Sequence, residues 1–107
     1  MEIRYYKDQQ GQAPLTQWID DLKDIWARAQ IRARLLRLAD GNLGHCKPLE
    51  NGVQELKIDL GPGYRVYLSR QGSVWVLLLC GGDKGDQSRD IERAIGYLND
   101  WKQRGKP

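Results

Sequence analysis

The sequence is poor in the residues that bind metals or form disulfide bonds. It has two cysteines, Cys46 and Cys80, and one histidine, His45. The cysteines are not spaced as a redox or zinc pair, and Cys80 ends an apolar run in which a thiol usually packs as a small hydrophobic group. A structural zinc site needs four ligands, so these residues alone cannot close one. We expect two free thiols, no metal and no other cofactor.

No segment of the sequence is suited to crossing a membrane. The longest apolar run covers residues 74–80, far short of the roughly 20 residues that a transmembrane helix needs. The N-terminus, Met1-Glu2-Ile3-Arg4, lacks the basic-then-apolar layout of a secretion signal. These absences predict a cytoplasmic protein with no membrane partner.

The chain also has only a small excess of positive charge. Its 17 lysines and arginines stand against 14 acidic residues, for a net charge of +3. Such an excess indicates a partner only where it is concentrated. With 107 residues, of which 40% are hydrophobic, the chain has the size and composition of one globular domain, expected to span residues 1–107.

Apolar spacing predicts two successive helices after a short strand at residues 3–6, and a third helix near the C-terminus. The first helix begins at Pro14, and its apolar stripe consists of Leu15, Trp18, Ile19, Leu22 and Ile25. The stripe of the second consists of Ala27, Ile31, Leu35 and Leu38. Gly41 then suits a left-handed C-cap. The first two helices are expected to form a hairpin.

Between the second and the third expected helices, apolar residues recur at every second position, which predicts a three-stranded antiparallel meander. Its strands are expected at residues 54–60, 64–68 and 74–80, with turns at 61–63 and at Gln71-Gly72. The last strand is apolar at nearly every position and is expected in the middle of the sheet. Residues 41–52 predict a loop. The order β-α-α-β-β-β-α indicates an α+β fold with an antiparallel sheet, an N-terminal helical hairpin and a C-terminal helix.

The polar face of the meander is expected to bring basic residues together. Lys57 and Arg65 project from the same side of adjoining strands, and Lys84 follows the last strand. Arginine offers a bidentate fork, lysine a point charge and the ring of Tyr67 a stacking surface, which together suit a phosphodiester backbone and a base. RNA is the natural ligand for such a cluster.

A second basic cluster lies in the segment of residues 27–39, which contains no acidic residue. Its cations are Arg28, Arg32, Arg34 and Arg37. A helix of this kind can bind a polyanion. The candidate RNA-binding residues are Tyr67, Arg28, Arg32 and Asp83.

Each cluster also has a structural explanation. Lys57 and Arg65 could simply pair with Glu55 or Asp59 across the strands, as solvated ion pairs that add little to the stability of the fold. The arginines of the helix could equally face solvent or pair with the aspartates of the preceding helix. The tryptophans on or beside the helical stripes are expected in the core, and these are Trp18, Trp26 and Trp101.

Residues 81–85, Gly-Gly-Asp-Lys-Gly, predict a flexible connection after the last strand. They lack the Gly-Lys-Ser/Thr ending of an ATP-binding phosphate loop, so the glycines are expected to turn the backbone or to let it approach a ligand. Asp86 or Ser88 is expected to cap the last helix. Asp83 and Asp90 are acids close to the basic cluster and could move a proton.

Three motifs together give the sequence a resemblance to a known family. They are Gly61-Pro-Gly-Tyr-Arg-Val-Tyr67, Leu77-Leu-Leu-Cys-Gly-Gly-Asp-Lys84 and Arg89-Asp-Ile-Glu-Arg-Ala94. With residues 18–24 and the Gly41-Asn42 loop, they make nearly the whole chain similar to the RelE/HigB superfamily of type II toxin-antitoxin toxins, specifically its addiction-module killer branch. The motifs are fairly specific in combination.

The resemblance implies a small bacterial toxin that enters the ribosomal A site and cleaves messenger RNA without a metal. A cognate antitoxin, often of the helix-turn-helix type, would block it. In the family's chemistry the ribose 2′-hydroxyl attacks the adjacent phosphate. Arg65 matches the family's central-strand arginine, Lys57 the basic residue of the preceding strand and Lys84 the one after the last strand. These cations would stabilise the charge that develops on the phosphorane.

The sequence departs from the family pattern where a general base is expected. Asp59 replaces a second hairpin lysine, and Asp90 or Ile91 stands near the relatives' late tyrosine or histidine. An acid with a raised pKa, Asp83 or Asp90, or the ribosome itself would have to move the proton. The catalytic candidates are therefore Arg65, Lys84, Lys57 and Asp90. The alternatives are a noncatalytic module of the same fold that binds RNA or an antitoxin, and an interaction domain with no nucleic-acid role.

Overall fold

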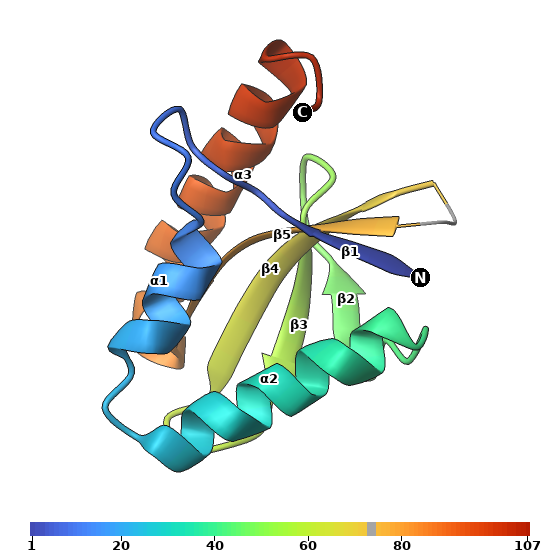
Figure 1. Cartoon of the computed structure of the whole chain (residues 1–107). Coiled ribbons are helices and arrows are strands. Elements are labelled where there is room, and N and C mark those ends of the chain that lie inside the picture. The colour runs from blue at the N-terminus through green and yellow to red at the C-terminus, as the bar shows by residue number, and fades with distance from the viewer. Residues whose placement is uncertain (73–74) are drawn as a thin grey trace.

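The computed structural model describes residues 1–72 and 75–107, in which five strands and three helices form an α+β fold (Figure 1). The strands are β1 (Glu2–Tyr5), β2 (Cys46–Pro48), β3 (Gln54–Ile58), β4 (Tyr64–Gln71) and β5 (Trp75–Gly82). The helices are α1 (Pro14–Asp21), α2 (Ile25–Ala39) and α3 (Gln87–Gln103), and a 3₁₀ turn, η1 (Lys84–Asp86), precedes α3. The expected first residue of the last strand, Val74, lies outside the described residues.

The strands form one mixed sheet in the order β1-β5-β4-β3-β2. The antiparallel meander is confirmed, since β3 pairs with β4 and β4 with β5. The expectation of a wholly antiparallel sheet is wrong, because β1 runs parallel to β5. Most of the chain separates these two strands, and so long a connection permits a parallel pair. With β1 on one edge of β5, the middle of the sheet is β4 and not β5.

The strand β2 lies in the segment that the sequence predicts as a loop. It pairs with β3 through a turn that contains Asn51 and Gly52, whose φ angles are +59° and +82°. Three residues are too few to show a period of two. Pro48 also argues against a strand anywhere but at a sheet edge, which is where β2 lies.

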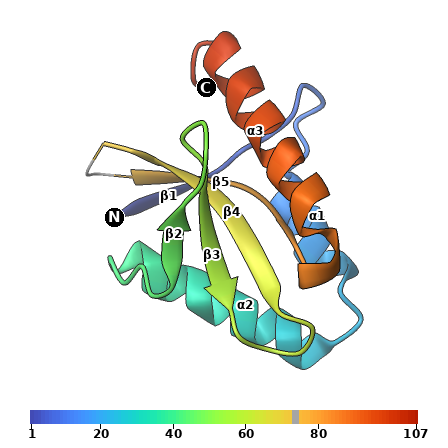
Figure 2. The same ribbon diagram turned by 180° about the vertical axis from the view of Figure 1, so that it is seen from behind.

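The helices cover opposite faces of the sheet (Figures 1 and 2). One hydrophobic cluster joins α1 and α2 to one face, and a second joins α3 to the other. The strand β4 serves both, because its side chains alternate: Val66 and Leu68 belong to the first cluster and Tyr67 to the second. Arg65, two residues before Tyr67, therefore projects on the α3 side. None of the described helices has the length and apolar character needed to span a bilayer.

The first helix is shorter than its apolar stripe predicts. It ends at Asp21, and Asp24 caps α2 by accepting hydrogen bonds from the backbone N–H groups of Trp26 and Ala27 at 3.0 and 3.2 Å. Ile25 therefore begins α2 and is exposed. Trp26 is exposed as well, so its expected place in the core is wrong, whereas the buried Trp101 is confirmed there. Figure 1 shows α1 and α2 at a steep angle, each on the sheet, and not side by side as a hairpin.

Gly81 and Gly82 end β5, where the sequence predicts a flexible connection. Side chains pack directly on both backbones. A Cβ atom on Gly81 would lie 2.4 Å from a ring carbon of Trp18, and one on Gly82 would lie 1.8 Å from Asp90 Oδ2. These strand positions require glycine because α1 and α3 approach them from opposite faces.

Candidate functional site

Lys57, Arg65 and Lys84 line one hollow beside the turn between β3 and β4. The register pairs Lys57 directly with Arg65, and Lys84 begins η1 after β5. The hollow has a volume of about 300 Å³. Its other lining residues are Asp59, Gly61, Pro62 and Gly63. We call it the basic pocket. The structure thus brings together the three cations that the sequence selects from separate segments.

Glycine in the turn lets the pocket close around the arginine. Gly63 has a φ of +82°, which favours glycine, and its carbonyl accepts a hydrogen bond from Arg65 Nη1 at 2.5 Å. A Cβ atom on Gly63 would lie 2.9 Å from Arg65 Nη1 and 3.6 Å from Lys84 Cβ. A side chain here would occupy the space between the two cations.

Arg65 is nearly buried, unlike an ordinary surface cation. Its side chain is 7% exposed, and its Nε lies 3.9 Å from Oε2 of Glu55, whose side chain is 3% exposed. The same Glu55 oxygen accepts a hydrogen bond from Gln87 Nε2 at 2.7 Å. The predicted pairing with Glu55 is present, but it is a buried contact that fixes the guanidinium. A fixed charge shielded from water acts more strongly than a mobile one on the surface.

Glu55 lies in a second hollow of about 380 Å³, lined also by Lys47, Lys57, Arg65 and Gln87. We call it the Glu55 pocket. Because it shares Lys57 and Arg65 with the basic pocket, a carboxylate that can accept a proton adjoins the cations that can bind a phosphate. Sequence reasoning treated Glu55 only as an ion-pair partner. The available signal was its position two residues before Lys57, which places both side chains on one face of the strand.

Tyr67 is not a surface for stacking a base. Its exposed fraction is 0%, and it belongs to the hydrophobic cluster under α3. Burial, followed by the charge of Glu55, raises the pKa of its hydroxyl. The alternation along the strand is as expected, but α3 covers this part of the polar face, so the prediction that Tyr67 contacts RNA is wrong.

The replacement Tyr67→Phe should stabilise the fold. The Tyr67 hydroxyl is buried and has no hydrogen-bond partner among residues 1–72 and 75–107, so removing it should raise the free energy of unfolding by about 1 kcal/mol. RNA binding should not change. Urea unfolding and RNA titration of both proteins measure these effects, and weaker RNA binding by the variant would contradict the assignment.

Asp90, the candidate base, lies in the first turn of α3 on its buried side, and is not among the lining residues of either pocket. Its carboxylate packs on Gly82, and its Oδ1 lies 3.6 Å from Arg93 Nη1. Burial raises the pKa of Asp90, and the charge of Arg93 opposes that shift. The expected direction of the pKa shift is present, but the group holds α3 to β5 instead of facing the three cations. Glu55 replaces it as the candidate proton acceptor.

The raised pKa of Asp90 gives stability a defined pH dependence. The folded protein holds this proton more tightly than the unfolded chain, whose aspartate pKa is about 3.9. Ionisation of Asp90 therefore lowers the free energy of unfolding as pH rises from about 4 through the folded pKa. The variant Asp90→Asn should not lose stability in this way. Its free energy of unfolding should therefore rise relative to that of the wild type as pH increases from 4 to 7. Urea unfolding across that range would contradict the placement if the two curves stayed parallel.

The remaining RNA-binding candidates make internal contacts and are not among the lining residues of the two pockets. Asp83 caps η1, its Oδ1 accepting the N–H of Gly85 at 2.9 Å. Arg28 Nε donates to the carbonyl of Leu22 at 2.6 Å, and Arg32 pairs with Asp20 at 2.8 Å. Both arginines thus hold α2 against the end of α1, which is the structural alternative for this cluster.

Comparison with known proteins assigns the chain to a family. No protein-family model matches the sequence. Over 77 residues, which are 72% of this chain and 78% of the relative, the sequence is 52% identical to an uncharacterized protein of Haemophilus influenzae. The matched region covers most of both chains. The protein therefore belongs to the same family as this Haemophilus influenzae protein.

Proposed function

We propose that the protein is the toxin of a type II toxin-antitoxin module, a ribosome-dependent endoribonuclease that cleaves messenger RNA in the cytoplasm without a metal. The observation that carries the proposal is the basic pocket, in which Lys57, Arg65 and Lys84 meet beside the buried carboxylate of Glu55. The resemblance of the sequence motifs to RelE/HigB toxins supports it. On this proposal, the partners are the ribosome, its messenger RNA and a cognate antitoxin, of the helix-turn-helix type in keeping with that resemblance.

The proposed reaction is a transesterification within the RNA strand. The 2′-oxygen of a ribose attacks the adjacent phosphorus as its proton passes to Glu55, and the bond from phosphorus to the 5′-oxygen breaks. The leaving 5′-oxygen takes up a proton from water, so the products carry a 2′,3′-cyclic phosphate and a 5′-hydroxyl. Arg65 and the two lysines stabilise the negative charge that develops on the phosphorane oxygens.

Glu55 has two tasks in this scheme. At 3.9 Å from Arg65 Nε, it holds the guanidinium in place before RNA binds, and it is the carboxylate of the Glu55 pocket that can accept the 2′-hydroxyl proton. Arginine stays protonated at all relevant pH values. The guanidinium therefore supplies a permanent positive charge, while proton transfer is left to the carboxylate.

A second candidate function is a noncatalytic module that binds RNA or an antitoxin through the same fold. The observation that favours it is the engagement of Arg65, which already donates from Nη1 to the Gly63 carbonyl and faces Glu55 with Nε. A module of this kind would hold RNA through the exposed lysines without cutting it. Its binding would weaken with salt, and no new RNA ends would form.

Induced expression in bacterial cells, with growth curves and mapping of transcript ends, tests the proposal. We expect growth arrest and new ends within translated regions, with 5′-hydroxyl and 2′,3′-cyclic phosphate termini. The variant Glu55→Gln should lose cleavage, while Lys102→Gln, which replaces an exposed lysine at the end of α3, should retain it. Intact transcripts with unhindered growth would refute the nuclease, and arrest without new ends would favour the binding module.

A further inference from the structure

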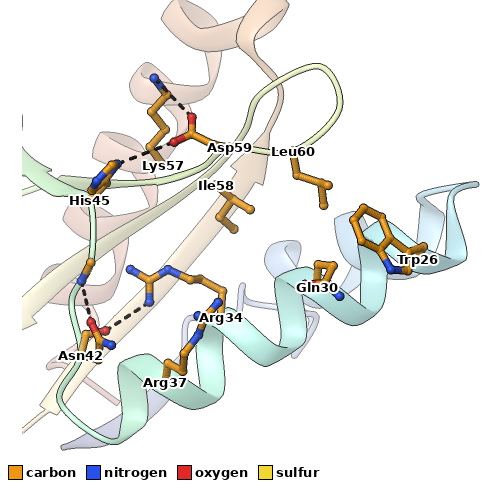
Figure 3. Close-up of a pocket in the computed structure, with 11 residues that line it drawn as sticks. Trp26, Gln30, Arg34, Arg37, Asn42, His45, Lys57, Ile58, Asp59 and Leu60 are labelled. Atoms are coloured by element: carbon orange, nitrogen blue, oxygen red, sulfur yellow. Dashed lines mark hydrogen bonds and ion pairs between the residues drawn. The ribbon is translucent and has the colours of Figure 1, made fainter.

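A third hollow, of about 410 Å³, lies between α2, the segment that leads into β2 and the end of β3 (Figure 3). We call it the α2 pocket. The lining residues that matter here are Trp26, Arg34, Arg37, His45, Lys57 and Asp59. In Figure 3, Trp26 stands at one end and Arg34 and Arg37 at the other. Lys57 is common to this pocket, the Glu55 pocket and the basic pocket.

The α2 pocket is positively charged and partly rigid. Arg34 is fixed, because its Nη1 and Nη2 donate to the carbonyls of Asn42 and Leu43 at 3.2 and 2.8 Å. Arg37 is exposed one turn further along the same helix. Asp59 contributes a carboxylate to the lining. Its Oδ1 lies 3.5 Å from Lys57 Nζ and its Oδ2 lies 3.7 Å from His45 Nδ1. The arginines of α2 are therefore left to attract an anion.

Trp26 gives the α2 pocket an aromatic surface. It is 60% exposed, and its position is set by the Asp24 cap, which binds the Trp26 backbone N–H at 3.0 Å. A large, exposed indole in the same pocket as several cations is a combination that binds single-stranded nucleic acid, in which bases stack on the ring and phosphates pair with the cations. The helical apolar pattern predicts Trp26 in the core, where its ring could not contact a ligand.

We propose that the α2 pocket binds the part of the RNA strand that adjoins the cleaved dinucleotide, with one base on Trp26 and a phosphate further along the strand at Arg37. Trp26 and Arg37 lie eleven positions apart on α2, about 16 Å at the helical rise of about 1.5 Å per residue, so more than one nucleotide occupies the pocket. The inference rests on the proposed function. Because Lys57 lines all three hollows, the basic pocket and the α2 pocket adjoin, and a strand held in the first can continue into the second. That continuity favours RNA over an acidic peptide, which would gain little from a stacking surface.

Fluorescence anisotropy with fully 2′-O-methylated, and hence uncleavable, RNA of two and eight nucleotides tests this inference. The variant Trp26→Ala should bind the octanucleotide about tenfold more weakly, and Trp26→Phe should restore most of the loss. Arg37→Gln should reduce the salt dependence by about one phosphate contact, or about 0.7 in the slope of log K against log salt. Leu36→Ala, which replaces an exposed apolar side chain of the same helix, and Lys102→Gln serve as controls.

The two RNA lengths separate this inference from the function beneath it. Both variants should bind the dinucleotide as the wild type does, because its single linkage fills only the basic pocket. If Trp26→Ala and Arg37→Gln bound the octanucleotide as the wild type does, the inference that the α2 pocket binds RNA would be wrong, while the proposed function would stand. No wild-type binding of either RNA would instead refute the proposed function. Tight binding of a polyglutamate peptide that Trp26→Ala abolishes would overturn the assignment to nucleic acid.

Discussion

Replacing Arg65 by glutamine should lower the rate of messenger RNA cleavage by about 10²–10³-fold, the usual effect of removing one donor that stabilises a developing anion. The reason is the placement of the guanidinium in the basic pocket, where it is nearly buried and held by Glu55 and the Gly63 carbonyl. Cleavage rates in translating ribosomes measure the effect. Arg65→Lys should recover only part of the rate, since lysine lacks the planar fork.

The same replacement should destabilise the fold, so a second variant is needed to separate activity from stability. Arg65→Gln leaves the buried Glu55 carboxylate with only the exposed Lys47, at 3.9 Å from its Oε1, as an ion-pair partner, so the loss should approach the roughly 3–5 kcal/mol of a broken buried pair. The double variant Glu55→Gln, Arg65→Gln buries no charge and should regain most of this free energy while staying inactive. Full cleavage by either variant would show that Arg65 takes no part in the reaction.

Placing a methyl group on Gly82 should destabilise the protein by about 3 kcal/mol, the upper end of the usual range for overpacking a core. The new Cβ in Gly82→Ala would lie 1.8 Å from Asp90 Oδ2, so α3 would have to move away from β5. Removing the obstructing carboxylate should relieve the strain. Urea unfolding of Gly82→Ala, Asp90→Ala and the double variant should therefore give a favourable coupling energy of at least about 1 kcal/mol.

Gly96 provides the matched control for this effect. It lies in α3 with no atom within 4 Å of a built Cβ, so Gly96→Ala should stabilise the helix by up to about 1 kcal/mol. If Gly82→Ala were no more harmful than Gly96→Ala, or equally harmful with and without Asp90, the contact between α3 and the end of β5 would be wrong.

Features set by neighbouring residues could be predicted from the sequence. The turn at residues 61–63 joins two alternating strands, so the pairing of Lys57 with Arg65 follows from local pattern and is observed. The buried stripe of α2 is confirmed for the same reason. Its members are Ala27, Ile31, Leu35 and Leu38.

Features set by distant segments could not be predicted in this way. The alternation along β4 shows that Tyr67 and Arg65 share a face of the sheet. It does not show that α3, some 20 residues later in the chain, covers Tyr67 and leaves Arg65 beside a pocket. Asp90, in the first turn of the same helix, is buried against Gly82 at the end of β5. Trp26 is exposed because the Asp24 cap starts α2 at Ile25. Apolar spacing alone predicts a later start, with Ile25 still in the stripe of the first helix.

The account as a whole depends on Lys57, Arg65 and Lys84 acting on a single phosphodiester. Its most direct test is a two-dimensional ¹⁵N NMR titration of the protein with a 2′-O-methylated dinucleoside monophosphate, a ligand that carries one phosphate. We predict saturable shift changes centred on the backbone signals of residues 57, 63–65 and 84–85, and loss of those changes when any of the three cations is replaced. Shifts confined to another surface, or none at millimolar ligand, would contradict the account.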